Sequence, residues 1–142
     1  MMTPEMTAKL RRSLIQHEAY SKFPYVDSVG KITIGIGYNL TDRGIDDDWI
    51  IKQYNEDVTY FYNQLINFDW FEHLTTDRQI VLIDMAFMGW KKFLTFKKML
   101  EAISKGDYQQ AAFEMLNSKW AQQTKNRAAQ LAQAMLTGTY SI

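Results

Sequence analysis

One short stretch of β-branched residues and glycines interrupts a sequence that otherwise has the periodicity of helices. It runs from Tyr25 to Tyr38, with Gly30 near its centre. Valine, isoleucine and threonine favour strands, and glycine suits a tight turn, so this stretch predicts a β-hairpin. On its second arm, three isoleucines alternate with Thr33 and two glycines, so the face opposite the isoleucines is nearly bare. Glycines in a strand often mark the close approach of a ligand or of another backbone.

The remainder of the chain predicts helices. Thr3 followed by Pro4 suits a helix start, and apolar residues then recur every four positions in a helix over about 4–20. The uninterrupted apolar run Ile80–Ile83 predicts a central helix that is buried on most sides. Further helices are expected near 46–68, 78–88, 93–104, 107–117 and 125–136, after a turn at 42–44, with Asp107 and Thr124 as caps and Gly138 as the stop. The expected fold class is α+β and mainly α.

Length and composition narrow the function classes. A chain of 142 residues fits one domain, and the absence of cysteine excludes disulfides and thiolate chemistry. The segment Met1–Glu5 lacks the pattern of a secretory signal, so synthesis in the cytoplasm is expected. Residues 1–90 carry a net charge of −5 and residues 91–142 carry +5. These charges could lie on helix faces exposed to water, or the basic part of the chain could bind an anionic polymer. The charge distribution alone does not distinguish the two interpretations.

Two carboxyl groups stand out by their positions. Glu18 is expected near the C-terminal end of the first helix, where unpaired carbonyls disfavour a second negative charge, so it should keep its proton. Asp27 is expected in a polar turn with Ser28 and Gly30, where water and backbone N–H groups keep a carboxylate ionised. Such a pair supplies the acid and the base that glycoside hydrolysis requires. Most of the 16 acidic residues are expected to be solvated surface charges, so position alone does not decide.

The segment from His17 to Thr41 resembles the active-site segment of the phage-type lysozymes, glycoside hydrolase family 24. The family pattern is an acid at the end of the first helix, then Tyr-x-Asp, then Gly-x-x-Thr-Ile-Gly-x-Gly. The matching residues here are Glu18, Tyr25, Asp27, Gly30, Thr33, Ile34, Gly35 and Gly37. The segments Ser118–Ala128 and Thr137–Tyr140 resemble the family's C-terminal signature, and the resemblance covers essentially the whole chain. One departure is Tyr38, where the family commonly has histidine.

The resemblance implies a muramidase, or endolysin, that cleaves the β-1,4 bonds between N-acetylmuramic acid and N-acetylglucosamine in bacterial peptidoglycan. Glu18 would be the general acid, Asp27 the carboxylate that assists water, and Thr33 a residue that helps hold that water. From the residues themselves, Thr33 is expected on the open hairpin face, within reach of a sugar or a water. No metal or cofactor is needed, since two carboxyls and water suffice.

Two further residues are candidates for sugar contact. Phe87 matches the family and could lie against the apolar face of a pyranose, although a phenylalanine on this helix is more often part of the core. Asn39 departs from the family's apolar residue, so an amide contact to sugar is inferred only from its chemistry. The matching residues Trp120, Asn126 and Arg127 are interpreted as structural, as a packed indole and a polar pair at a helix start.

Other functions were considered from the sequence. A zinc motif would need a histidine at position 21, which is Ser21, and the chain has only two histidines, so a metallohydrolase is excluded. The lysines of the basic part are scattered and no nucleic-acid recognition motif is present. The alternatives that stay open are a non-catalytic peptidoglycan-binding module on a lysozyme fold and a chitin-type glycosidase.

The resemblance also sets expectations for organisation and setting. A lysozyme-like single domain over 1–142 is expected, with a small β-hairpin lobe over roughly 16–60 and a helical lobe of 1–15 plus 61–142 around the central helix. Its partner would be the glycan strands of peptidoglycan, with no nucleic acid and no stable membrane insertion, and the protein would be a monomer. It would be made in the cytoplasm of a bacterial host and act on the wall after release by a separate pore or secretion system.

Overall fold

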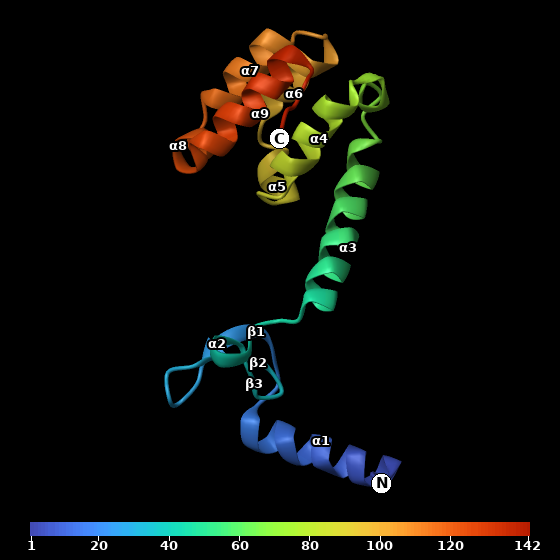
Figure 1. Cartoon of the computed structure of the whole chain (residues 1–142), viewed down its shortest axis with the longest axis vertical. Coiled ribbons are helices and arrows are strands. Elements are labelled where there is room, and N and C mark those ends of the chain that lie inside the picture. Colours follow the sequence, from blue (N-terminus) through green and yellow to red (C-terminus); the bar gives the residue numbers. More distant parts are fainter. The chain divides into compact units, whose positions relative to one another are not determined.

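The computed structural model describes residues 1–142, and it divides into two compact units, Met1–Gln53 and Tyr54–Ile142. Most of the chain is helical and one small sheet lies in the first unit, so the predicted α+β, mainly α class is confirmed (Figure 1). No helix is long and apolar enough to cross a membrane.

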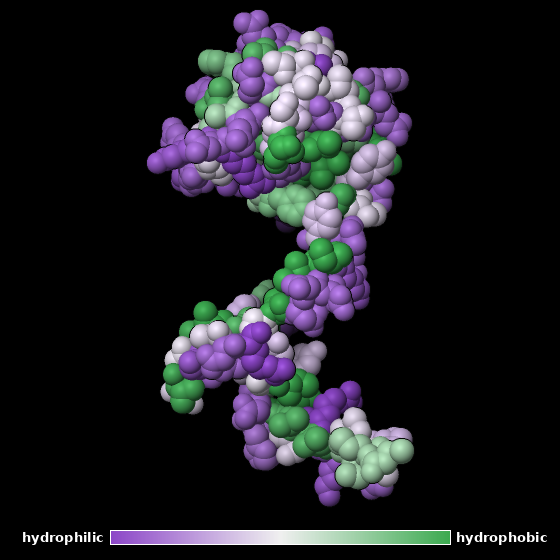
Figure 2. Space-filling view, viewed as in Figure 1, coloured by the Kyte–Doolittle hydropathy of each residue, from purple (hydrophilic) through white to green (hydrophobic).

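The first unit opens with α1, Pro4–Glu18, as the Thr3-Pro4 pair predicts. The Thr3 hydroxyl accepts a hydrogen bond from the Met6 amide at 3.1 Å and so caps the helix. The apolar stripe of α1 is exposed: Met6, Leu10 and Leu14 keep 52%, 48% and 40% of their surface, and Figure 2 shows apolar surface along this helix. The expected grouping of residues 1–15 with the helical lobe stays a prediction.

A three-stranded antiparallel sheet follows, and it corrects the predicted hairpin. The strands β1 (Ser21–Val26), β2 (Ile32–Gly35) and β3 (Tyr38–Asn39) pair in the order β1-β2-β3. The expected second arm does not continue through Ile36, because the chain turns there and returns as β3. Gly35 and Gly37 flank this turn with φ of 67° and 68°, a region that glycine adopts without steric cost.

Two helices connect the sheet to the second unit. Where a turn was predicted at 42–44, the chain forms the short helix α2, Leu40–Arg43, which ends at Gly44. The helix α3, Asp47–Leu65, confirms the helix predicted over 46–68 and continues into the second unit.

The second unit is built around α4, Thr76–Ala86, which follows the short 3-10 turn η1, Phe71–His73. Val81, Leu82 and Met85 are fully buried, which confirms a central helix. The predicted burial on most sides is confirmed for Val81 and Leu82 and in part for Ile83, which is half-buried, but not for Ile80, which keeps 44% of its surface exposed. The apolar run is longer than the part of a helix that one core can cover, since successive residues point about 100° apart.

The C-terminal part contains more breaks than the sequence pattern predicts. The helix expected over 93–104 is two helices, α5 (Trp90–Phe93) and α6 (Lys97–Ser104). Asp107 caps α7 (Tyr108–Leu116) and Gly138 ends α9 (Asn126–Thr137) as predicted. Between them lies the unpredicted helix α8, Lys119–Thr124, whose N-terminus is capped by the hydroxyl of Ser118.

The predicted cap at Thr124 was wrong. Its hydroxyl donates to the carbonyl of Trp120 at 2.9 Å, inside α8, and Lys125 with φ of 47° stands at the start of α9. Of the three residues interpreted as structural, Asn126 begins α9 as predicted, and the interpretation is confirmed for Trp120 and Arg127. Trp120 is buried, and Arg127 on α9 donates to the Asp84 carboxylate on α4 at 2.7 Å.

Candidate active site

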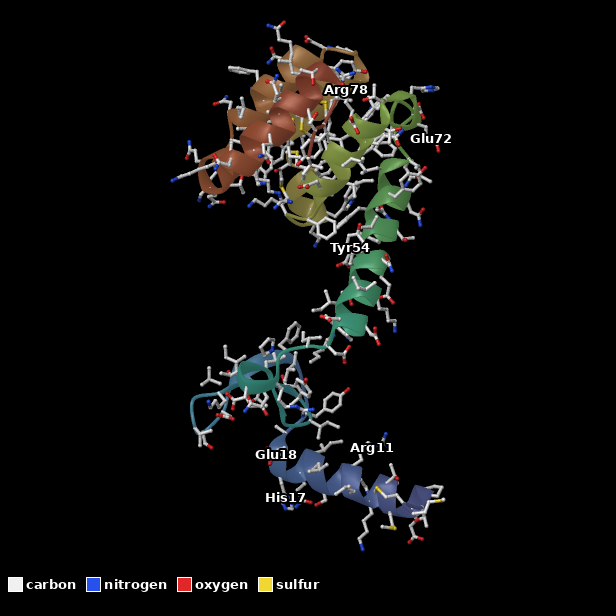
Figure 3. All side chains as sticks on the ribbon, viewed as in Figure 1. Arg11, His17, Glu18, Tyr54, Glu72 and Arg78 are labelled. Carbon is white, nitrogen blue, oxygen red and sulfur yellow. The ribbon has the colours of Figure 1, made fainter.

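Glu18 lies at the last position of α1, where the chain leaves the helix and enters the sheet (Figure 3). The hydroxyl of Tyr25, on β1, donates to the Glu18 backbone carbonyl at 2.9 Å. Ala19 follows with φ of 79°, a conformation that L side chains rarely adopt, and its amide still donates to the Ile15 carbonyl. The end of α1 is therefore tied to the sheet at the residue that carries the acid.

The Glu18 side chain lies directly against Gly37. A Cβ atom placed on Gly37 would stand 3.1 Å from both Cβ and Cγ of Glu18 and 3.2 Å from its Oε2. These distances are tighter than ordinary van der Waals contacts between carbon atoms. A close approach does occur at Gly37, but the approaching group is the side chain of Glu18 and not the ligand or backbone that the sequence pattern suggested. At Gly35 an added Cβ would meet nothing within 4 Å.

Asp27 sits in the turn between β1 and β2, and its carboxylate accepts hydrogen bonds on both oxygens. Its Oδ1 accepts from the amides of Lys31 at 2.8 Å and Val29 at 3.0 Å, and its Oδ2 accepts from the Thr33 hydroxyl at 3.2 Å. The Lys31 amide is the largest cause that holds the pKa of Asp27 below its ordinary value, and the Val29 amide, the Thr33 hydroxyl and the Lys31 charge act in the same direction. Partial desolvation opposes them. Asp27 is thus an ionised carboxylate at neutral pH, as predicted.

Thr33 is placed differently from the expectation. It is 4% exposed, so it does not project from an open surface. As a residue of the middle strand it pairs with Tyr25 on one side and with Asn39 on the other, which covers it. Its hydroxyl is within 3.4 Å of the Lys31 carbonyl as well as bonded to Asp27. Thr33 therefore contacts Asp27 directly, and this contact is the means by which it fixes the carboxylate.

Lys31 supports the same turn through a second carboxylate. Its ammonium group lies 3.0 Å from the Asp42 carboxylate. The hydrogen bond from Lys31 is the largest cause that lowers the pKa of Asp42, with a further contribution from Asn39. Lys31 thus contacts both acids. Its backbone amide donates to the Asp27 carboxylate, and its ammonium group donates to the Asp42 carboxylate.

The other two candidate residues have different surroundings. Asn39 caps α2: its amide oxygen accepts from the Asp42 amide at 3.0 Å, and its nitrogen donates to the Asp42 carboxylate at 2.9 Å. Both ends of the Asn39 side chain are therefore already used within the chain. Phe87 ends α4 in the second unit, is 43% exposed, and packs edge-on against Phe61 at 5.1 Å. It lines an apolar cavity of about 490 Å³ with Tyr54 and side chains of α4.

Within the first unit the structure links Glu18, Asp27 and Thr33 through one sheet. Tyr25 is the residue whose role sequence reasoning missed, since its hydroxyl holds the Glu18 carbonyl while its backbone pairs with Thr33. The Tyr-x-Asp element of the sequence was the available signal. No group of three or more histidine, cysteine or acidic side chains is arranged to hold a metal ion. The arrangement offers one carboxyl at a helix end and one ionised carboxylate fixed by three donors.

Comparison with known proteins identifies two relatives, both from Dictyostelium discoideum. A protein named probable T4-type lysozyme 1 is 39% identical over 70 residues, which are 49% of this chain and 41% of that protein. The matched segment thus spans less than half the length of this relative. A protein named probable T4-type lysozyme 2 is 26% identical over an alignment that covers 94% of this chain and 97% of that protein. No family model matches the chain.

Proposed function

We propose that the chain is a phage-type lysozyme, a muramidase that cleaves the β-1,4 bonds between N-acetylmuramic acid and N-acetylglucosamine in peptidoglycan, and its similarity to two proteins named probable T4-type lysozymes supports this. The observation that carries the proposal is a pair of carboxyl groups held by one small sheet, with Glu18 at the end of α1 and Asp27 in the turn between β1 and β2. Asp27 is held ionised by Lys31, Val29 and Thr33, and Glu18 is packed against Gly37. Hydrolysis of a glycosidic bond requires one carboxyl group that donates a proton and one carboxylate that is ionised.

The proposed roles follow from these surroundings. Glu18 donates its proton to the glycosidic oxygen as the bond to the departing sugar breaks. Asp27 is ionised before the step and, as general base, takes a proton from the attacking water and becomes neutral, with Thr33 helping to hold that water. Tyr25 and Gly37 act as positioning residues, because they fix the backbone and the side chain of Glu18. After bond cleavage one carboxyl has lost a proton and the other has gained one, so exchange with solvent restores both.

We propose that the reaction inverts the anomeric centre. Inversion needs a water between the second carboxylate and the sugar, and carboxyl separations of about 6.5–9.5 Å leave room for it. A separation of about 5–5.5 Å would favour direct attack by Asp27 and a covalent intermediate. All three donors to Asp27 come from the turn between β1 and β2 and from β2 itself, so one hairpin holds the carboxylate in place.

The test is the substitution Glu18→Gln, with Glu5→Gln at the opposite end of α1 as the matched control. Glu18→Gln keeps the size of the side chain and removes the transferable proton, so it should abolish the clearing of purified cell-wall suspensions. Glu5→Gln makes the same chemical change far from the sheet and should leave the rate of clearing unchanged. Equal residual clearing by the two variants would show that Glu18 is not the acid.

Two alternatives have distinct outcomes when sedimentation with cell wall and release of reducing sugar are measured. A non-catalytic wall-binding module would sediment with cell wall but release no reducing sugar with any variant. A chitin-type glycosidase would release reducing sugar from chitin as well as from peptidoglycan, because the acid and base would be shared and only the sugar contacts would differ. We propose release from peptidoglycan alone. Phe87 and Asn39 remain proposed sugar contacts.

The biological setting is also part of the proposal. We propose that the protein is a phage endolysin that acts as a monomer, is made in the host cytoplasm and reaches the wall through a separate pore or secretion system. Lysis of cells that express the chain together with a pore-forming protein, but not of cells that express the chain alone, is the expected result.

A further inference from the structure

A cavity in the second unit, remote in sequence from Glu18 and Asp27, is lined by lysines. It has a volume of about 380 Å³ and lies where the end of α5, the start of α6, the end of α7 and the start of α8 meet. Its charged lining side chains are Lys92, Lys97, Lys98, Lys119 and one carboxylate, Glu114. Figure 2 shows a strongly hydrophilic surface at the end of this unit where Figure 1 places α8.

The four lysines have no acidic partner. The ion pairs of the protein are formed by Lys31, Lys105 and Arg127, none of which lines the cavity. Glu114 accepts a hydrogen bond from Gln110 at 3.0 Å instead of from a lysine. Like charges gathered around one concave surface repel each other, and a bound anion would relieve that repulsion.

Uncharged donors are left without acceptors at the same place. The helix α6 starts at Lys97 and has no side-chain cap, so its first backbone N–H groups lack a side-chain acceptor. Trp120, which lines the cavity, is 3% exposed and its indole Nε1 has no hydrogen-bond partner. The Nε1 atom itself is inaccessible, so Trp120 forms part of the cavity wall and its indole signal can report on binding there, while the donors that an anion can reach are the four lysines and the start of α6.

The lining also indicates the kind of anion. Arginine is the residue that matches planar, bidentate recognition of carboxylates, and no arginine lines this cavity. Lysines act as point charges with three donors each, which suits the tetrahedral oxygens of phosphate. We propose that this cavity, defined by Lys92, Lys97, Lys98 and Lys119, is a binding site for phosphate groups, either free or carried on a phosphodiester polymer.

The experiment is a titration of the isotope-labelled whole chain with inorganic phosphate, followed by amide and indole NMR signals. Saturable shifts are expected at the amides of Lys97 and Lys98 and at the indole N–H of Trp120. The double substitution Lys97→Gln with Lys98→Gln should raise the dissociation constant about tenfold, since each exposed ion pair contributes modestly. The matched control, Lys52→Gln with Lys91→Gln, removes two lysines that do not line the cavity and should leave the constant unchanged.

Acetate at equal ionic strength is the comparison that tests the anion class. Equal shifts with acetate, or an unchanged constant in the Lys97/Lys98 variant, would overturn the proposal. A poly(glycerol phosphate) chain that binds more tightly per phosphate than the free ion would identify the polymer as the ligand, and equal binding would identify free phosphate. This readout is binding, so it is independent of whether the chain is a muramidase.

Discussion

The contact between Gly37 and Glu18 leads to a substitution whose effect can be divided into two parts. Gly37→Ala adds a methyl group at a position with φ of 68°, and that group would stand 3.1 Å from the Cβ and Cγ of Glu18. Gly35→Ala adds the same methyl group at φ of 67° but meets nothing within 4 Å. The two variants therefore share the backbone strain, and only one of them displaces the proposed acid.

The shared part is a loss of stability. A left-handed conformation costs an L residue about 1–2 kcal/mol, and alanine recovers part of this by restricting the unfolded chain. Both variants should therefore lose about 1 kcal/mol of unfolding free energy, measured by urea denaturation.

The separate part is a loss of activity. Glu18 must give way by a few tenths of an ångström in Gly37→Ala. A misplacement of about 1 Å can cost about a hundredfold in rate, so a smaller displacement should lower kcat by about threefold to tenfold. Gly35→Ala should retain the parent kcat. Reducing-sugar release from purified cell wall measures both, and the reasoning fails if the two variants have equal rates at equal folded fractions.

Further predictions concern acidity, chemistry and the core. Because the folded pKa of Asp27 is lowered, this carboxylate contributes stability that is present above its ordinary value of 3.8 and is lost as pH falls through its folded pKa. Acid unfolding monitored by circular dichroism should therefore start at higher pH in Asp27→Asn than in the parent. Thr33→Val should lower the rate of wall cleavage while Thr33→Ser retains it, since only valine removes the hydroxyl bound to Asp27. Glu18→Gln should melt at or above the parent temperature, because catalytic carboxyls are often held at a cost in stability, and a drop of many degrees would make Glu18 a structural residue. NMR of the first product should show the α anomer, whereas the β anomer would contradict inversion. Leu82→Ala should cost about 2–5 kcal/mol of unfolding free energy.

The sequence by itself determined the features that depend on local chemistry. The helix starts at Thr3-Pro4 and Asp107 and the stop at Gly138 follow from backbone hydrogen bonding and from conformational preference within a few residues. The ionised state of Asp27 was also predictable, because two of the donors that hold it come from amides within four residues. The sequence predicted that some group would approach the glycines of this stretch closely, but it did not predict that the group at Gly37 would be the side chain of Glu18.

The tertiary structure decided what depends on residues brought together from distant positions in the chain. Thr33 is a polar residue of the kind that commonly occupies the exposed face of a strand, and it is buried because it lies on the middle strand between β1 and β3. Thr124 has the chemistry of a cap, yet α8 places its hydroxyl on the carbonyl of Trp120 instead. The gathering of four lysines around one cavity arises because segments more than twenty residues apart in the chain meet there, which no local pattern encodes.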